Sequence, residues 1–308
     1  MIYTVTLNPS ADYFMDVPDF ETGRTNRAAE TQVVPGGKGI NVSRVLTRLE
    51  VKTKAIGFLA GFTGTFIENT LKEENLDTSF VYTEGMTRIN VKLKAGSETE
   101  INGTGCRITD RDQEELFGKL GELNGNDYLV LAGSLPDGAD KGIYRKAVEL
   151  ANRSKTKAIV DTVGLPLTEA LKAGPYLIKP NEAELSDFAG RELSGLDDVR
   201  KAAESAVQAG AENVLVSLGS RGALLVNRNH VLSARPPEGT LVNSVGAGDS
   251  MVAGFLYGET LGLPLKDCFA YSVASGSATA FSQGFCHKEQ VETLVKRVIV
   301  KHESGEEE

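Results

Sequence analysis

Short apolar runs rich in β-branched residues alternate with amphipathic stretches along most of the chain. The runs predict strands at Tyr3–Leu7, Thr53–Gly57, Tyr128–Ala132, Ala158–Asp161, Leu177–Lys179 and Asn213–Ser217. Helix-like stretches such as Lys141–Asn152 and Asp197–Ala209 lie between them. This alternation predicts an α/β fold in which a mainly parallel sheet has helices on both faces. Ligands of such sheets gather at the C-terminal ends of the strands.

Two stretches, residues 12–35 and 86–104, break this pattern because they show period-two runs without a helix, as at Ile89, Val91 and Leu93. They predict a small β-sheet that stands off the main domain, since structureless loops of this length are uncommon in compact domains. A pair of long surface loops is the alternative. The main domain then comprises residues 1–11, 36–85 and 105–308, and the polar, acidic tail 301–308 is expected to be disordered.

The run Val245–Ser250 places Gly246, Ala247 and Gly248 directly before Asp249, between a strand-like segment ending near Val245 and an apolar, helix-like stretch. A helix that starts here leaves its first backbone N–H groups free to hold an anion, and small residues let a phosphate approach them. Asp249 is then placed to take a proton from a hydroxyl, as phosphoryl transfer to an alcohol requires. A tight loop with Asp249 as an ordinary N-cap is the alternative.

A second glycine-rich helix entry covers residues 35–44 and contains Lys38 and Asn41. It lacks the third glycine of a dinucleotide-binding fingerprint and the Gly-Lys-Ser/Thr of a P-loop. Two glycine-rich loops about two hundred residues apart suggest one site with two ligands.

Composition removes several classes of function. The 308 residues carry a formal charge of −9, which disfavours a nucleic-acid surface. Three scattered cysteines are too few for a disulfide framework or a zinc site, so we expect buried free thiols, and the three histidines have no metal-binding spacing. Without an apolar run of membrane-spanning length, a cytoplasmic protein that binds neither membrane nor nucleic acid is expected.

The two glycine-rich motifs, Gly36–Asn41 and Gly246–Asp249, resemble the two signatures of the PfkB (ribokinase-like) carbohydrate kinases, and the resemblance covers nearly the whole chain. The opening Thr4–Asp12 and the runs Ala132–Pro136, Lys179–Glu184 and Val216–Gly219 look like the phosphosugar branch of this family. The resemblance implies a ribokinase-like three-layer sandwich with a β-sheet lid that often forms the dimer interface. It also implies ATP and Mg²⁺ as cofactors.

The resemblance further implies a role for each residue type. Asp249 is the expected base, and Gly246, Ala247 and Gly248 form the expected anion hole. The phosphate already on the sugar needs cations, for which Lys38, Arg24 and Arg88 are candidates. Candidates for the sugar hydroxyls are Asp12, Gly36, Gly37, Asn41, Asn102 and Ser134.

Nucleotide contacts are expected from the second half of the chain, at Lys179, Asn181, Ser217, Gly219, Gly222, Gly248 and Ser277. Asn181 and Glu184 lie three apart, and in the family such a pair organises Mg²⁺ through water. The same spacing also fits a helix capping box, and both can hold at once.

The expected reaction is transfer of the γ-phosphoryl group of ATP to the 6-hydroxyl of fructose 1-phosphate. Tagatose 6-phosphate is the alternative acceptor, since the motifs do not fix the stereochemistry of the sugar. A regulator that binds sugar phosphates without catalysis is a third hypothesis, which the intact Asp249 motif disfavours. The partner expectation is a homodimer formed through the lid.

Overall fold

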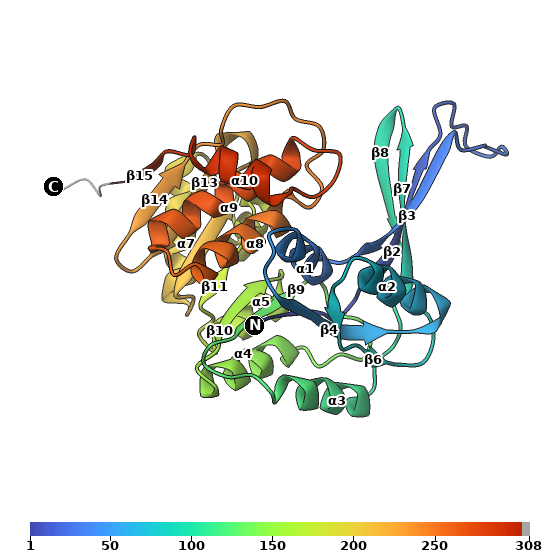
Figure 1. The fold of residues 1–308 in the computed structure, drawn as a ribbon, viewed down its shortest axis with the longest axis horizontal. Helices are drawn as coiled ribbons and strands as arrows, with labels where there is room; N and C mark the ends of the chain where they lie inside the picture. The colour runs from blue at the N-terminus through green and yellow to red at the C-terminus, as the bar shows by residue number, and fades with distance from the viewer. Residues whose placement is uncertain (304–308) are drawn as a thin grey trace.

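The computed structural model describes residues 1–303 and contains a large sheet between two helical layers and a small sheet that projects from one end (Figure 1). The large sheet has the order β15-β14-β13-β12-β11-β10-β9-β1-β4-β5, and β6 pairs with β4. Its strands are β1 (Ile2–Thr6), β4 (Thr53–Leu59), β5 (Asp77–Thr78), β6 (Val81–Tyr82), β9 (Tyr128–Ala132), β10 (Lys157–Asp161), β11 (Leu177–Ile178), β12 (Asn213–Ser217), β13 (Ala223–Asn227), β14 (Val231–Ala234) and β15 (Val300–His302). The pairs from β5 to β12 are parallel, whereas β13, β14 and β15 extend the sheet antiparallel.

Alternation of side chains along the strands builds one core on each face of this sheet. In β9, Leu129 and Leu131 enter one core and Val130 and Ala132 enter the other. The first core is covered by α3 (Asp110–Leu120), α4 (Ile143–Arg153), α5 (Leu165–Leu171), α6 (Glu182–Ala189) and α7 (Leu196–Gln208). The second is covered by α1 (Lys38–Arg48), α8 (Ala247–Thr260), α9 (Leu265–Ala280) and α10 (Lys288–Val295), while α2 (Gly61–Glu73) closes a smaller cluster beside β4. The predicted α/β architecture is confirmed.

The small sheet has the order β3-β2-β7-β8, with bounds β2 (Ser10–Asp16), β3 (Glu30–Gly36), β7 (Arg88–Ala95) and β8 (Ser97–Asn102). Its two central strands, β2 and β7, run parallel and pair residues 78 positions apart, such as Asp12 and Asn90. The expectation of strands outside the main sheet in these two stretches is confirmed. Asp12 therefore lies inside β2, a strand of the small sheet.

The two faces of the small sheet differ in polarity. Asp12 and its register neighbours point to one face, where polar side chains dominate. Across the other face, Val33, Tyr13, Val91 and Ile101 form one row through all four strands. The ends of this row are exposed to solvent, at 42% for Val33 and 58% for Ile101.

Two local expectations are wrong. No strand precedes the Gly246 loop, because residues 235–246 lack a sheet partner; Leu241 and Val242 are exposed, and the N–H of Val242 donates to the carbonyl of Ala280. The chain end is also more ordered than expected, since β15 pairs with β14 through residue 302. Residues 304–308 of the expected disordered tail lie outside the described residues.

The C-terminal end of α8 is tied to the N-terminal ends of the central strands β9, β10 and β11. The carboxylate of Glu259 accepts hydrogen bonds from the hydroxyls of Tyr128 and Tyr176 and from Lys157. Because α8 begins at Ala247, these contacts fix the helix that carries the Gly246 loop.

Within residues 1–303, the three cysteines are buried and free, as expected. No cluster of three or more potential metal ligands of the His, Cys, Asp or Glu type occurs there, and no helix in this part is long and apolar enough to cross a membrane.

Candidate active site

The start of α8 forms the anion loop that the sequence predicts. Gly246 is the N-cap, with φ +76, a left-handed conformation that favours glycine. The N–H groups of Gly248 and Asp249 lie in the first helical turn, where no intrahelical acceptor exists. The N–H of Ala247 donates to the carbonyl of Ser244, so this expected donor is engaged. A Cβ added at Gly248 would lie 3.1 Å from Nζ of Lys179, which places this lysine against the loop.

Asp249 is buried beside this loop, and its Oδ2 accepts a 2.8 Å hydrogen bond from the amide of Asn41. Burial and the nearby charge of Asp161 raise the pKa of Asp249 to about 6, against the opposing effects of Asn41, Lys179 and Lys38. A carboxylate with such a pKa is a better proton acceptor near neutral pH than an ordinary aspartate. The geometry therefore suits a general base.

Lys38 lies at the centre of the site, between the carboxylates of Asp161 at the end of β10 and of Glu184 in α6. Its Nζ is 2.8 Å from Oδ1 of Asp161 and 3.2 Å from Oε1 of Glu184. Burial opposes the charge on Lys38, but these two partners outweigh it and raise its pKa. The sequence suggested that Lys38 holds the phosphate at the far end of the sugar. The structure instead directs its amine to the Asp249 side, because buried Asp161 at the end of β10 attracts it.

Asp161 balances the positive charges of this centre. Burial opposes its ionisation, yet Lys179 and Lys38 hold the pKa of Asp161 below its usual range. Lys179, itself 5% exposed, approaches Oδ2 to 3.4 Å, but that oxygen has no hydrogen-bond partner among residues 1–303. One oxygen of a buried carboxylate thus remains available to a further cation or donor.

Asn181 and Glu184 form the capping box that their spacing allowed. The side chain of Asn181 accepts from the N–H of Glu184 at 2.8 Å, and Oε2 of Glu184 accepts from the N–H of Asn181 at 2.9 Å. Asn181 follows β11 and pairs with Ser217 through an isolated bridge. The capping box fixes Glu184 where its second oxygen meets Lys38.

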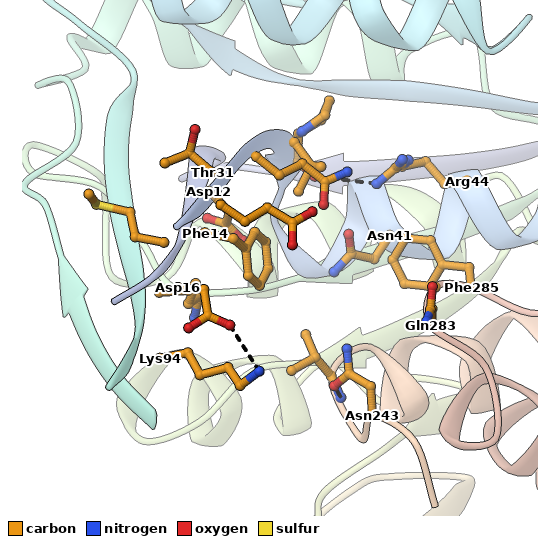
Figure 2. A pocket seen from close by; sticks show the side chains of 18 of the residues that line it. Asp12, Phe14, Asp16, Thr31, Asn41, Arg44, Lys94, Asn243, Gln283 and Phe285 are labelled. Atoms are coloured by element: carbon orange, nitrogen blue, oxygen red, sulfur yellow. Dashed lines mark hydrogen bonds and ion pairs between the residues drawn. The ribbon is translucent and has the colours of Figure 1, made fainter. Parts of the chain in front are cut away.

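A cavity of about 450 Å³ lies between the polar face of the small sheet and α1 (Figure 2). Of the residues expected to bind sugar hydroxyls, Asp12 and Asn41 line it. The carboxylate of Asp12 accepts from Ser10 and Asn90, and it lies so close to Gly36 that any Cβ there would collide with it. Gly37 adopts φ +123 at the turn into α1, whose first turn is held by a hydrogen bond from the N–H of Ile40 to Thr6.

Four other residues that were expected to contact the sugar or its phosphate lie outside the lining of this cavity. Arg88 is half-buried on the polar face of the small sheet, where burial lowers its pKa and the charge of Asp12 partly offsets this effect. In the described part of the chain, its Nε has no hydrogen-bond partner. Arg24 is 75% exposed and pairs with Glu21. Asn102 is exposed on the edge strand β8, and exposed Ser134 accepts a 3.2 Å hydrogen bond from Asn8. None of these four lines the cavity.

A second cavity, of about 600 Å³, lies on the other side of the 243–248 segment. Its lining includes most of the residues that were expected to contact nucleotide: Asn181, Ser217, Gly219, Gly222, Gly248 and Ser277. Lys179 is not among the lining residues of this cavity, although it touches Gly248. Apolar side chains of α9 and the chain that follows it, such as Val273 and Phe281, form one wall.

Several lining residues were not found from the sequence. In the first cavity they include Arg44 and Arg48, whose guanidinium groups lie 5.2 and 5.8 Å from the centre of the Phe285 ring. Asn41, Arg44 and Arg48 share one face of α1 by their i, i+3, i+7 spacing, so helical periodicity was a usable signal. In the second cavity the loop residues Pro236–Leu241 were missed, because nothing in their sequence indicates contact with a ligand.

The buried carboxylate of Asp249 is hydrogen-bonded to Asn41, which lines the first cavity, and follows Gly248, which lines the second. This arrangement is that of a phosphotransferase in which donor and acceptor meet at Asp249. Comparison with known proteins agrees. The model of the pfkB family carbohydrate kinases matches residues 5–291, and the chain belongs to this family. It is therefore an ATP-dependent sugar kinase.

Similar proteins extend over the full chain. A 1-phosphofructokinase of Bacillus subtilis is 46% identical over 97% of this chain and 99% of its own length. A D-tagatose-1-phosphate kinase of Bacillus licheniformis is 35% identical over 98% and 100% of the two chains. The crystal structure of phosphofructokinase-2 from Escherichia coli in complex with substrates and products superposes with a TM-score of 0.90, at 32% identity over 96% and 98% of the two chains.

Proposed function

We propose that this kinase transfers the γ-phosphoryl group of ATP to the 6-hydroxyl of fructose 1-phosphate, giving fructose 1,6-bisphosphate. The observation that carries the proposal is the position of buried Asp249, whose partner Asn41 lines the first cavity and whose neighbour Gly248 lines the second, together with its pKa raised to about 6. The choice of sugar is supported by the 46% identity to a 1-phosphofructokinase over nearly the full chain.

In the proposed reaction, ATP binds in the second cavity and the sugar phosphate in the first. Asp249 accepts the proton of the sugar hydroxyl while the oxygen of that hydroxyl forms a bond to the γ-phosphorus. The bond from the γ-phosphorus to the bridging oxygen breaks, and this oxygen leaves with ADP. The first-turn N–H groups of α8 stabilise the charge on the transferring oxygens. Lys38 and Lys179, which lie on the Asp161 side of the loop, add positive charge at the same place.

Mg²⁺ fits the oxygen-rich side of this centre. Asp161 offers a carboxylate oxygen without a hydrogen bond, and Glu184 offers an oxygen that now contacts only Lys38. Magnesium prefers such oxygens and keeps several of its waters, so Asn181 and Glu184 would hold it through water. When bound, it would neutralise charge on the phosphates of the nucleotide.

Arg88 is the cation that fits the phosphate already carried by the sugar. It lies on the same face of the small sheet as Asp12, and its buried Nε lacks a partner. An anion in reach of this group would remove the cost of an unsatisfied buried donor. The small sheet then acts as a lid that brings Arg88 and Asp12 onto the sugar.

The apolar row Val33–Tyr13–Val91–Ile101 supports a homodimer in which the lids of two copies pack together. Apolar side chains at the centre and exposed ends of a sheet face are a typical dimer surface. An Ile101→Glu variant should sediment as a monomer at concentrations where the wild type is dimeric. Glu98→Gln, on the opposite face of the same strand, should not change the mass, and equal masses for wild type and Ile101→Glu would contradict the lid dimer.

The substrate is tested by measuring kcat/KM with fructose 1-phosphate, fructose 6-phosphate, tagatose 1-phosphate and tagatose 6-phosphate under one MgATP condition. Fructose 1-phosphate should give the highest value. Tagatose 1-phosphate is the second candidate, because a D-tagatose-1-phosphate kinase is among the similar proteins. A higher value for any other sugar would replace the proposed substrate, and no ADP release with any of them would favour a non-catalytic sugar-phosphate binder.

A further inference from the structure

A groove of about 560 Å³ lies at the antiparallel edge of the main sheet, away from the sugar cavity. Its floor includes the buried side chains Leu218 and Leu224. Four cations line it from separate parts of the chain: Arg221, Arg235, Arg297 and Lys301. Nothing in the proposed reaction uses this groove.

The charge of the groove is opposite to that of the chain. The protein carries a formal charge of −9, yet the four cations here face only two lining carboxylates, Glu238 and Glu303. Arg221 is paired with Glu182 outside the groove. Arg235, Arg297 and Lys301 form no ion pair with any of residues 1–303. Like charges that line one groove repel one another, so an anion bound among them would relieve that repulsion.

Only a thin wall separates this groove from the nucleotide cavity. Ala223, Pro236, Pro237 and Glu238 line both spaces. Gly222, which lines the nucleotide cavity, lies so close to the next strand that an added Cβ would be 2.9 Å from Cα of Arg235. A movement of the Arg235 backbone in the groove would therefore press on the backbone of Gly222, which lines the nucleotide cavity.

We propose that the groove binds a phosphorylated anion and that its occupancy changes the affinity of the nucleotide cavity. The arginine fork matches a phosphate group bidentately, and the apolar floor accommodates the body of a phosphate ester. Only the second half of the proposal rests on the proposed function, because binding in the groove does not require the neighbouring cavity to hold ATP.

Calorimetry with pyrophosphate tests the binding. The full-length protein is first saturated with Mg²⁺ and a non-hydrolysable ATP analogue, so that the nucleotide cavity is closed to the probe. Arg235→Ala/Arg297→Ala should weaken pyrophosphate binding at least about tenfold, since two charge-assisted contacts are lost. Arg228→Ala, an exposed arginine outside the groove, should leave the Kd within about twofold.

Arg88→Ala serves as the second control, because pyrophosphate held at the proposed sugar-phosphate site beside Arg88 would be lost in that variant and kept in the double variant. Loss of pyrophosphate binding in Arg88→Ala with retention in the double variant would overturn the proposal. It would also be overturned if the wild type did not bind pyrophosphate, or if the wild type and the double variant had the same Kd.

The coupling is read from the Kd of the ATP analogue with and without saturating pyrophosphate. Linkage requires the same factor in both directions, so a change of at least about twofold is expected in the wild type and none in the double variant. An unchanged Kd in the wild type would overturn the coupling. A wild type that binds pyrophosphate in the groove but phosphorylates no sugar would instead refute the proposed function, which separates the two failures.

Discussion

Replacing Lys38 by methionine tests whether this side chain serves the transferring phosphoryl group or the distal phosphate of the sugar. Methionine keeps most of the length and removes the charge that lies 2.8 Å from Asp161 and 3.2 Å from Glu184. If Lys38 acts at the transferring group, its contact forms mainly in the transition state, and kcat falls while the KM for the sugar phosphate changes little.

The size of the loss follows from the burial of the amine. A hydrogen bond to a charged group contributes about 1.5–3 kcal/mol, which corresponds to roughly 10- to 150-fold in rate. Because 35% of the Lys38 side chain is exposed, solvent screens the contact, and we expect roughly a 10- to 30-fold fall in kcat. Lys179 still neutralises Asp161 in the variant, so the fold should survive, as a thermal unfolding curve will show.

The pH profile gives an independent readout. Lys38 is one of the charges that lower the pKa of Asp249, which lies at about 6. Asp249 acts as a carboxylate, so activity is lost as the pH falls through this pKa. Without Lys38 the pKa rises, and the acidic limb of the kcat/KM profile should move to higher pH.

Lys94→Met is the matched control, since this exposed lysine lines the sugar cavity and pairs with Asp16. This variant should keep kcat within about twofold of the wild type, and the midpoint of the acidic limb of its pH profile should not shift. A Lys38→Met enzyme with unchanged kcat, an unshifted pH profile and a raised KM for the sugar phosphate would refute the reasoning and return Lys38 to the distal phosphate.

Three further perturbations follow from the site. Asp249→Asn should lower kcat by roughly 10²- to 10⁴-fold, as removal of a general base does, and should leave the Kd for ATP within a few fold; a variant with over a tenth of wild-type kcat would contradict the assignment. Wild-type kcat/KM should rise with pH to a plateau, with a midpoint near 6, and a flat profile between pH 5 and 7 would exclude Asp249 as the titrating base. Arg88→Ala should raise the KM for the sugar phosphate roughly 10- to 100-fold with a smaller effect on kcat, whereas an effect on the KM for ATP alone would place its role elsewhere.

The sequence predicted the parallel sheet because buried strands are marked by dense apolar runs, and β9 and β12 begin and end where those runs do. It was wrong about a strand before Val245, because a run of apolar residues in an exposed loop has the same composition as an edge strand. Only the backbone partners distinguish the two, and the partner of Val242 is the carbonyl of Ala280, which no local pattern reveals.

Some features of the candidate site could likewise be predicted from the sequence, and others could not. Glycine positions were informative because a positive φ or a close approach, as at Gly246 and Gly36, restricts the residue locally. The direction of the Lys38 side chain could not be predicted from the sequence, because it depends on Asp161. Asp161 is 123 positions away in sequence and is brought close by the pairing of strands in the main sheet. Long side chains on flexible stems take their direction from distant charges, so their partners require the fold.

The parallel pairing of β2 and β7 has a consequence for the order of folding. These strands form the centre of the small sheet, yet their partners are 78 residues apart, and β4 and α2 of the main body lie between them in sequence. Closing so long a loop costs entropy that a four-stranded sheet without a core of its own repays poorly. We therefore expect the main sheet to assemble first around β1 and β4, and the half of the sugar site that carries Asp12 and Arg88 to be completed last.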